Sequence, residues 1–297
     1  MKPINLTNKY VLAISGGVDS VTLLDLVIKG TLDKSNIIIA HVDHGIREDS
    51  YKDLDLVKDL AQKYDLAFYY KVLELGPNTS EVKARNYRYN FLNNVLAQTN
   101  AKSLITAHHQ DDLIETILIN LIRGTNRRGL TSLSSNQKIF RPLLNYSKQE
   151  IINYAKENKL QWREDSTNNN TDYLRNYLRL KVLNNLSKNN RQKIISINES
   201  QKNLNQKIDL ILENIYNQNI KDNKLDRLWF SSFDFKIQKE ILAYWLRRNG
   251  LLEFNAKQIE RTVNSLKVAT PGAIIEVSKG YNFDIQRKLL ALQVLER

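Results

Sequence analysis

The sequence predicts an α/β protein: a doubly wound parallel sheet followed by a smaller, mainly helical α+β domain. Two observations favour this fold class. Over roughly the first 125 residues, short apolar runs alternate with longer segments of helical periodicity, as in successive βαβ units. After about residue 190 this alternation gives way to polar helical segments and one apolar hairpin. We therefore expect three parts, residues 1–190, a linker helix at 191–215, and residues 216–297.

The alternating pattern of the first part places each element in turn. The apolar runs expected to form strands are 10–14, 36–42, 66–72 and 103–107, and the helical patterns cover 18–29, 49–64, 80–97 and about 111–122. Parallel strands joined by helices bring their carboxyl ends to one edge of a sheet, and ligands bind beyond that edge. The loops after Ile14, Val42 and Ala107 are therefore the expected functional loops.

The rest of the chain predicts a second, smaller unit. The pattern is irregular after about residue 131, and the polar stretch 164–172 indicates a loop. Further helices are expected near 235–248 and 256–266, beyond the linker helix. Apolar runs on both sides of the pair Lys279-Gly280, at 273–277 and 281–285, predict a hairpin.

Composition limits the classes of function. The net charge of +12 favours a polyanionic partner, nucleic acid being the commonest, although a proteome rich in Lys and Asn is the alternative explanation. The absence of cysteine excludes disulfides, thiolate metal sites and cysteine nucleophiles. The N-terminus lacks the features of a secretion signal, and no apolar run is long enough to span a bilayer. We expect a cytoplasmic protein with no membrane partner.

The sharpest motif is Ser15-Gly16-Gly17-Val18-Asp19-Ser20, between a strand and a helix. Its two glycines permit close approach of the backbone to an anion, and the helix start supplies unpaired N–H groups. The motif indicates a phosphate-binding loop that differs from a Walker A loop. An ordinary strand-to-helix turn would need only one glycine and no acid, whereas Asp19 is suited to Mg²⁺ between phosphates.

Two segments at strand ends, 41–50 and 106–116, contain all four histidines. In the second, Asp112 and Glu115 share a helix face and His108 precedes it. Such a group can bind Mg²⁺, orient an amine or move protons. A zinc site is the rival, disfavoured because the side chains of the first segment diverge at a strand end. A solvated acidic helix start explains Asp112 but not His108 and Glu115.

The phosphate loop resembles that of the N-type ATP pyrophosphatases, which adenylate a substrate and release pyrophosphate. The other segments resemble, in the same order, those of the tRNA(Ile)-lysidine synthetase family. The resemblance covers roughly residues 8 to 185, and its motifs are HVDHGIR at 41–47, AHHQDDLIET at 107–116, NTSEVKAR with RY at 78–89, LIRGT at 121–125, RPLL at 141–144, EDSTN at 164–168 and RNYLR at 175–179.

This resemblance implies an ATP- and Mg²⁺-dependent ligase that modifies tRNA. L-lysine would be joined to C2 of the wobble cytidine in the CAU anticodon of tRNA(Ile), through an adenylated cytidine, with release of AMP and pyrophosphate. The C-terminal part would bind tRNA, and a homodimer is left open. His108, Asp112 and Glu115 occupy the positions that the family uses at its catalytic centre, and Asp19, Arg175 and Arg179 complete the expected catalytic set. ATP and pyrophosphate are expected to bind Ser15, Gly16, Gly17, Val18, Asp19, Ser20, Arg85 and Arg123; Asp43, Asp112 or Glu115 is expected to bind lysine; and Asp19 is expected to hold the metal. The alternative for the arginines, which also include Arg88 and Arg141, is to bind tRNA phosphates.

Three alternatives share some of these features. A tRNA thiolase would need cysteine, which the chain lacks. Synthetases of NAD or GMP share the loop but give no reason for the histidine-rich segments. An RNA-binding module without catalytic activity accounts for the positive charge, and ATP consumption would distinguish it from an enzyme.

Overall fold

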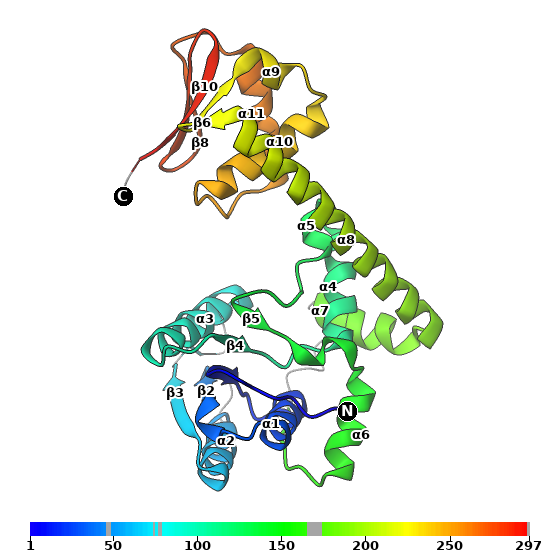
Figure 1. Cartoon of the computed structure of the whole chain (residues 1–297). Helices are drawn as coiled ribbons and strands as arrows, with labels where there is room; N and C mark the ends of the chain where they lie inside the picture. Colours follow the sequence, from blue (N-terminus) through cyan, green and yellow to red (C-terminus); the bar gives the residue numbers. More distant parts are fainter. Residues whose placement is uncertain (46–48, 74, 77–78, 165–173, 296–297) are drawn as a thin grey trace. The chain divides into compact units, whose positions relative to one another are not determined.

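The computed structural model describes residues 1–45, 49–73, 75–76, 79–164 and 174–295 (Figure 1). Contacts between residues divide the chain into two compact units. The first comprises Met1–Ile122 and Ser132–Ile195, and the second comprises Arg123–Thr131 and Ser196–Arg297. The division into a catalytic part, a linker and a tRNA-binding part stays a prediction.

A five-stranded parallel sheet forms the centre of the first unit, in the order β3-β2-β1-β4-β5. Its strands are β1 (Tyr10–Ala13), β2 (Ile37–Asp43), β3 (Ala67–Val72), β4 (Ser103–Ile105) and β5 (Ile139–Phe140). The four expected strands are confirmed. The fifth strand was not expected, because two residues are too few to give an alternating pattern.

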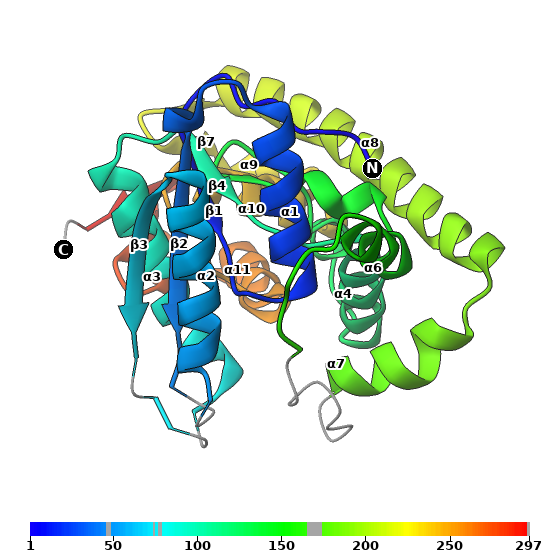
Figure 2. The same cartoon turned by 90° about the horizontal axis from the view of Figure 1, so that it is seen from below.

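Helices cover both faces of this sheet, which confirms the predicted doubly wound class (Figure 1). Leu12 of β1 packs with α1 and α2, while its neighbour Val11 packs with Leu92 of α3 on the opposite face. Burial on both faces explains why these strands read as continuous apolar runs. Figure 2 shows α1 and α2 running alongside the strands. The helices are α1 (Val18–Gly30), α2 (Tyr51–Tyr64), α3 (Glu81–Gln98) and α4 (Gln110–Ile122), all near their expected positions.

Several short helices and one long helix complete the chain between the parallel sheet and the second sheet. Helix α6 (Lys148–Glu157) begins with a capping box, in which Ser147 and Glu150 bond to each other's backbone N–H groups. The others are α5 (Arg127–Leu130), α7 (Leu174–Tyr177), α8 (Lys188–Asn219), a π-helical turn (Leu178–Val182) and 3₁₀ turns at Lys34–Asn36, Pro142–Asn145 and Leu183–Asn185. The expected linker helix is thus part of a longer one, α8.

The second unit contains an antiparallel sheet in the order β6-β7-β10-β9-β8, together with α5, most of α8 and helices α9 to α11. The expected hairpin is confirmed, and Gly280 at its turn has a φ of 84°. Trp245 and Phe283 pack edge to face in its core, with ring centroids 5.0 Å apart. The elements are β6 (Ile220–Lys221), β7 (Lys224–Asp226), α9 (Arg227–Ser231), α10 (Phe235–Arg248), α11 (Ala256–Val268), β8 (Ile274–Ser278), β9 (Tyr281–Ile285) and β10 (Leu289–Val294). Over the described residues, no helix combines the length and apolarity of a membrane span.

Candidate active site

Hydrogen bonds of its own serines hold the conformation of the loop between β1 and α1. The Ser15 N–H donates to Ser20 Oγ over 3.2 Å, and Ser20 Oγ donates to the Gly17 carbonyl over 2.9 Å. Gly16 adopts a φ of 89°, in the left-handed region that favours glycine. Gly17 caps α1 without a side-chain hydrogen bond, so the first N–H groups of the helix are available to an anion.

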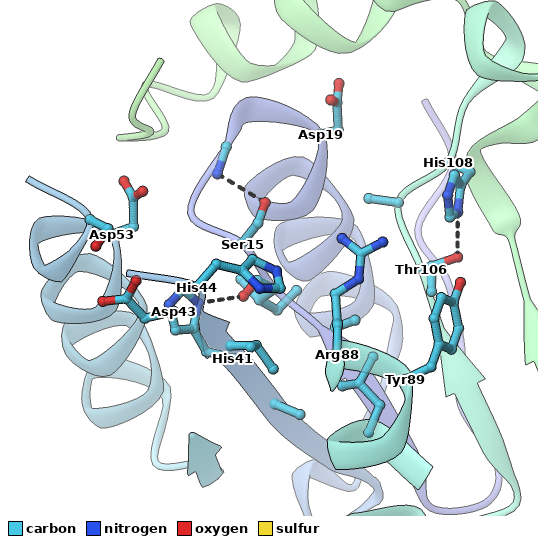
Figure 3. Close-up of a pocket in the computed structure, with 18 of the residues that line it drawn as sticks. Ser15, Asp19, His41, Asp43, His44, Asp53, Arg88, Tyr89, Thr106 and His108 are labelled. Carbon is cyan, nitrogen blue, oxygen red and sulfur yellow. Dashed lines mark hydrogen bonds between the residues drawn. The ribbon is translucent and has the colours of Figure 1, made fainter. Parts of the chain in front are cut away.

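A cavity of about 400 Å³ opens at the carboxyl ends of β1, β2 and β4, next to this loop (Figure 3). It brings together six of the predicted site residues, Ser15, Gly17, Asp19, Asp43, His108 and Asp112. Val18 and Ser20 are buried below the loop. The lining includes Arg88, one of the arginines considered for phosphate binding, and residues absent from the predicted site, among them His41, His44, Asp53, Tyr89, Thr106 and Arg163.

The segment after β4 supplies a neutral imidazole. His108 Nδ1 lies 2.8 Å from Thr106 Oγ1. Burial lowers the pKa of His108 to about 4, an effect to which the charge of Arg141 adds. The His108 side chain is therefore uncharged at neutral pH and is able to accept a proton.

Asp112 lies at the start of α4 and remains ionised. Burial opposes its ionisation, but the nearby His109 and Arg179 lower the pKa of Asp112. Its Oδ2 accepts from the His109 N–H at 3.0 Å, and its Oδ1 lies 3.2 Å from Arg179 Nη2. A charged carboxylate thus lines the cavity beside a neutral histidine.

Glu115 lies one helical turn further and is almost fully buried. It forms ion pairs with Arg175 and with Arg179, whose Nη2 is 3.0 Å from Glu115 Oε2. Burial nevertheless raises the pKa of Glu115. The two carboxyl groups thus differ in proton affinity, as paired acids with separate roles do.

Asp19 carries the only negative charge of the phosphate loop. Lys148 Nζ lies 2.7 and 2.8 Å from its two oxygens, and His109 Nε2 lies 3.8 Å from Oδ1. Across the part of the chain that the structure describes, no group of three acidic or histidine side chains could hold a metal. Asp19 therefore fits Mg²⁺ only if phosphate oxygens and water complete the coordination, as is usual with nucleotides.

The end of β2 is held by buried polar contacts. Asp43 is buried, and its Oδ1 accepts from the Gly45 N–H at 2.9 Å. His41 Nδ1 lies 2.8 Å from the Ile14 carbonyl oxygen, and burial lowers the pKa of His41. These contacts fix the ends of β1 and β2 at the rim of the cavity.

The predicted phosphate-binding arginines occupy different places. Arg85 is exposed on α3, with its guanidinium 4.8 Å from the centre of the Tyr89 ring. Arg123 is exposed and belongs to the second unit. Arg163, which was not predicted, lines the cavity and pairs with Asp49 and Asp53 at 2.6 and 2.8 Å. No local motif marks it; only its position directly before the 164–168 motif pointed to this region.

Comparison with known proteins identifies the family of this chain. A PP-loop domain family matches residues 2–186. The tRNA(Ile)-lysidine synthase of Mycoplasma mycoides subsp. mycoides is 34% identical over 279 residues, which cover 89% of this chain and 68% of that protein. The chain belongs to the tRNA(Ile)-lysidine synthase family.

Other members of the family are considerably longer than this chain. The Lactobacillus gasseri tRNA(Ile)-lysidine synthase is 40% identical over 193 residues, which cover 61% of this chain but only 44% of the relative. The chain thus spans about two thirds of the length of one curated relative and less than half of another.

A solved structure shares its fold with part of this chain. The U34-tRNA thiolase NcsA from Methanococcus maripaludis aligns over 66% of this chain and 72% of its own, with a TM-score of 0.54 and 20% identity. At this identity the likeness concerns the fold alone.

Proposed function

We propose that the chain uses ATP to join L-lysine to C2 of the wobble cytidine in tRNA(Ile) with a CAU anticodon. The names of its relatives and its PP-loop domain support this reaction. Attack of the cytosine C2 oxygen on the α-phosphate of ATP releases pyrophosphate and forms an adenylated cytidine. The lysine ε-amine then attacks C2, and AMP leaves with the former C2 oxygen.

One observation carries the proposal: a single cavity joins a helix start that has no side-chain cap to a neutral histidine and an ionised carboxylate. The loop from Ser15 to Ser20 would hold the phosphates, and Arg85 on α3 of the same unit is a further candidate for this role. Mg²⁺ held by Asp19 and the phosphates would offset negative charge on the leaving pyrophosphate.

The acidic residues and His108 would bind the lysine amine and remove a proton from it. A lysine ammonium binds best to an ionised carboxylate, the state of Asp112, and Asp43 is the second candidate. The amine attacks only after losing a proton, and neutral His108 or Glu115, with its raised pKa, would accept it. Arg175 and Arg179 would keep Glu115 in place.

The RNA must present an unpaired cytidine to this cavity, because C2 is not accessible in a stacked base. We propose that lysines and arginines of the second unit bind the tRNA backbone. A homodimer is the oligomeric state that we propose to test. The test is the mass of the chain in solution with and without tRNA.

The deciding experiment measures pyrophosphate release from ATP and Mg²⁺, with lysine and tRNA present or omitted in turn. Release that needs both substrates supports the ligase, and mass spectrometry of the RNA should then identify lysidine. Release that needs tRNA but not lysine would contradict lysine as the nucleophile. No release under any condition would contradict the enzymatic assignment and favour an RNA-binding module.

A further inference from the structure

The first residue of α6, Lys148, reaches the phosphate loop from outside the predicted motifs. Its ammonium contacts both oxygens of Asp19, which lies in the first turn of α1 and lines the cavity. The side chains of Lys148 and Asp19 are 38% and 28% exposed. An ion pair this accessible to water is weak, so the ammonium can exchange one anionic partner for another.

The main chain of Lys148, in contrast, is fixed. Its N–H donates to Asp111 Oδ1 over 3.2 Å, and Asp111 in turn pairs with Arg191 at 2.9 Å. Ser147 caps the same helix end, and the neighbouring Tyr146 carbonyl accepts from the Gln110 N–H at 2.9 Å. A flexible stem with a compact charge thus extends from a fixed point near the loop.

The negative charge of Asp19 explains why a lysine near the phosphate loop would assist phosphate binding. A phosphate bound by the loop would lie near the Asp19 carboxylate, and two like charges repel unless a cation lies between them. Lys148 supplies a cation at this carboxylate. When phosphate enters, the ammonium can turn to it and leave Asp19 to a metal carried by the nucleotide.

We propose that Lys148 is a phosphate-binding residue, whose ammonium moves from Asp19 to the diphosphate end of the nucleotide when the nucleotide binds. The proposal deepens the proposed function, since that function supplies the nucleotide. It makes no covalent bond and concerns binding alone.

The test measures binding of inorganic pyrophosphate to the full chain by calorimetry, with a chelator present to exclude divalent cations. The variants are Lys148→Met, Lys148→Arg and Asp19→Asn. Lys29→Met is the matched control. Like Lys148, Lys29 forms an ion pair with an acid of α1, in this case Asp25 at 2.7 Å. It also contacts Tyr154 of α6 and Asn158, the C-cap of that helix. It lies in the last turn of α1, away from the loop.

Loss of the ammonium in Lys148→Met should weaken pyrophosphate binding roughly tenfold or more, the effect of one charge-assisted hydrogen bond. Lys148→Arg should restore most of the affinity, and Lys29→Met should bind as the unaltered chain does. Asp19→Asn should bind at least as tightly, because it frees the ammonium and removes a negative charge. Unchanged affinity in Lys148→Met would overturn the proposal.

Equal weakening by Lys148→Met and Asp19→Asn would also overturn it, since that result indicates an ion pair that only holds α1 to α6. Thermal unfolding of each variant checks that the chain is folded. The assay contains neither lysine nor RNA, so its failure differs from failure of the proposed function. If the unaltered chain binds pyrophosphate through Lys148 but forms no lysidine, only the proposed function is wrong. If it binds no pyrophosphate without divalent cations, the role of Lys148 is overturned, and the Mg²⁺-dependent reaction is judged by lysidine formation alone.

Discussion

The carboxyl groups of Asp112 and Glu115 differ chemically although they lie one helical turn apart. Asp112 lines the cavity and is kept ionised by nearby basic groups, whereas burial raises the pKa of Glu115 behind it. Neutral His108 lies beside them. Single residues in this group should therefore affect charge binding and proton transfer separately.

Replacing Asp112 with Asn should remove the charge that binds the lysine ammonium while keeping the size of the side chain. We expect lysine-dependent pyrophosphate release to fall at least roughly a hundredfold, with normal tRNA binding. Stopped assays with labelled ATP measure the first quantity, and gel shifts measure the second. Turnover like that of the unaltered chain would show that Asp112 has no such role.

The pKa of His108 makes a prediction about stability. Burial lowers it from 6.5 to about 4, so between these values the unfolded chain binds a proton at His108 that the folded chain does not. Stability should therefore fall as the pH decreases. From about pH 7 to pH 5, the free energy of unfolding should drop in both proteins. The drop should be about 2 kcal/mol smaller in His108→Asn than in the unaltered chain. Urea titrations at both pH values measure this, and parallel losses would contradict it.

At the scale of elements, the N-terminal cap of α6 fixes the position of the Lys148 backbone. Ser147 accepts from the Glu150 N–H, and Glu150 accepts from the Ser147 N–H. Ser147→Ala should lower the stability of the first unit by roughly 1 kcal/mol and weaken pyrophosphate binding, because the first turn of α6 frays. Ser80→Ala, at the cap of α3, is the control for binding. Denaturation and calorimetry measure the two effects; a Ser147→Ala variant that binds like Ser80→Ala would separate the cap from the site.

The elements also explain what the sequence could and could not predict. The motif residues after β1, β2 and β4 meet because parallel strands end at one edge, so their proximity followed from the βαβ pattern alone. Lys148 and Arg163 come from beyond residue 131, where strands of two residues and irregular turns leave no period to follow. The capping box before α6 was a signal, but it could not indicate where the lysine side chain points.

At the scale of the whole molecule, the net charge of +12 bears on RNA binding. If the chain binds tRNA through phosphate contacts, its affinity should fall at least roughly tenfold between about 50 and 200 mM salt. Fluorescence anisotropy with labelled tRNA measures the slope. A salt-independent affinity would mean that the positive charge of this chain does not contact the RNA backbone.

The short segment Arg123–Thr131 has a consequence for the architecture. Arg127 pairs with Asp209 and Glu240, both at 2.9 Å, which ties this segment to α8 and α10 within the second unit. The chain consequently passes between the units after Ile122, after Thr131 and after Ile195. The second unit is therefore not formed by one continuous segment of the chain. Replacing the C-terminal third with that of a relative would remove Asp209 and Glu240 and leave Arg127 with foreign partners, so a working exchange should include residues 123–131 as well.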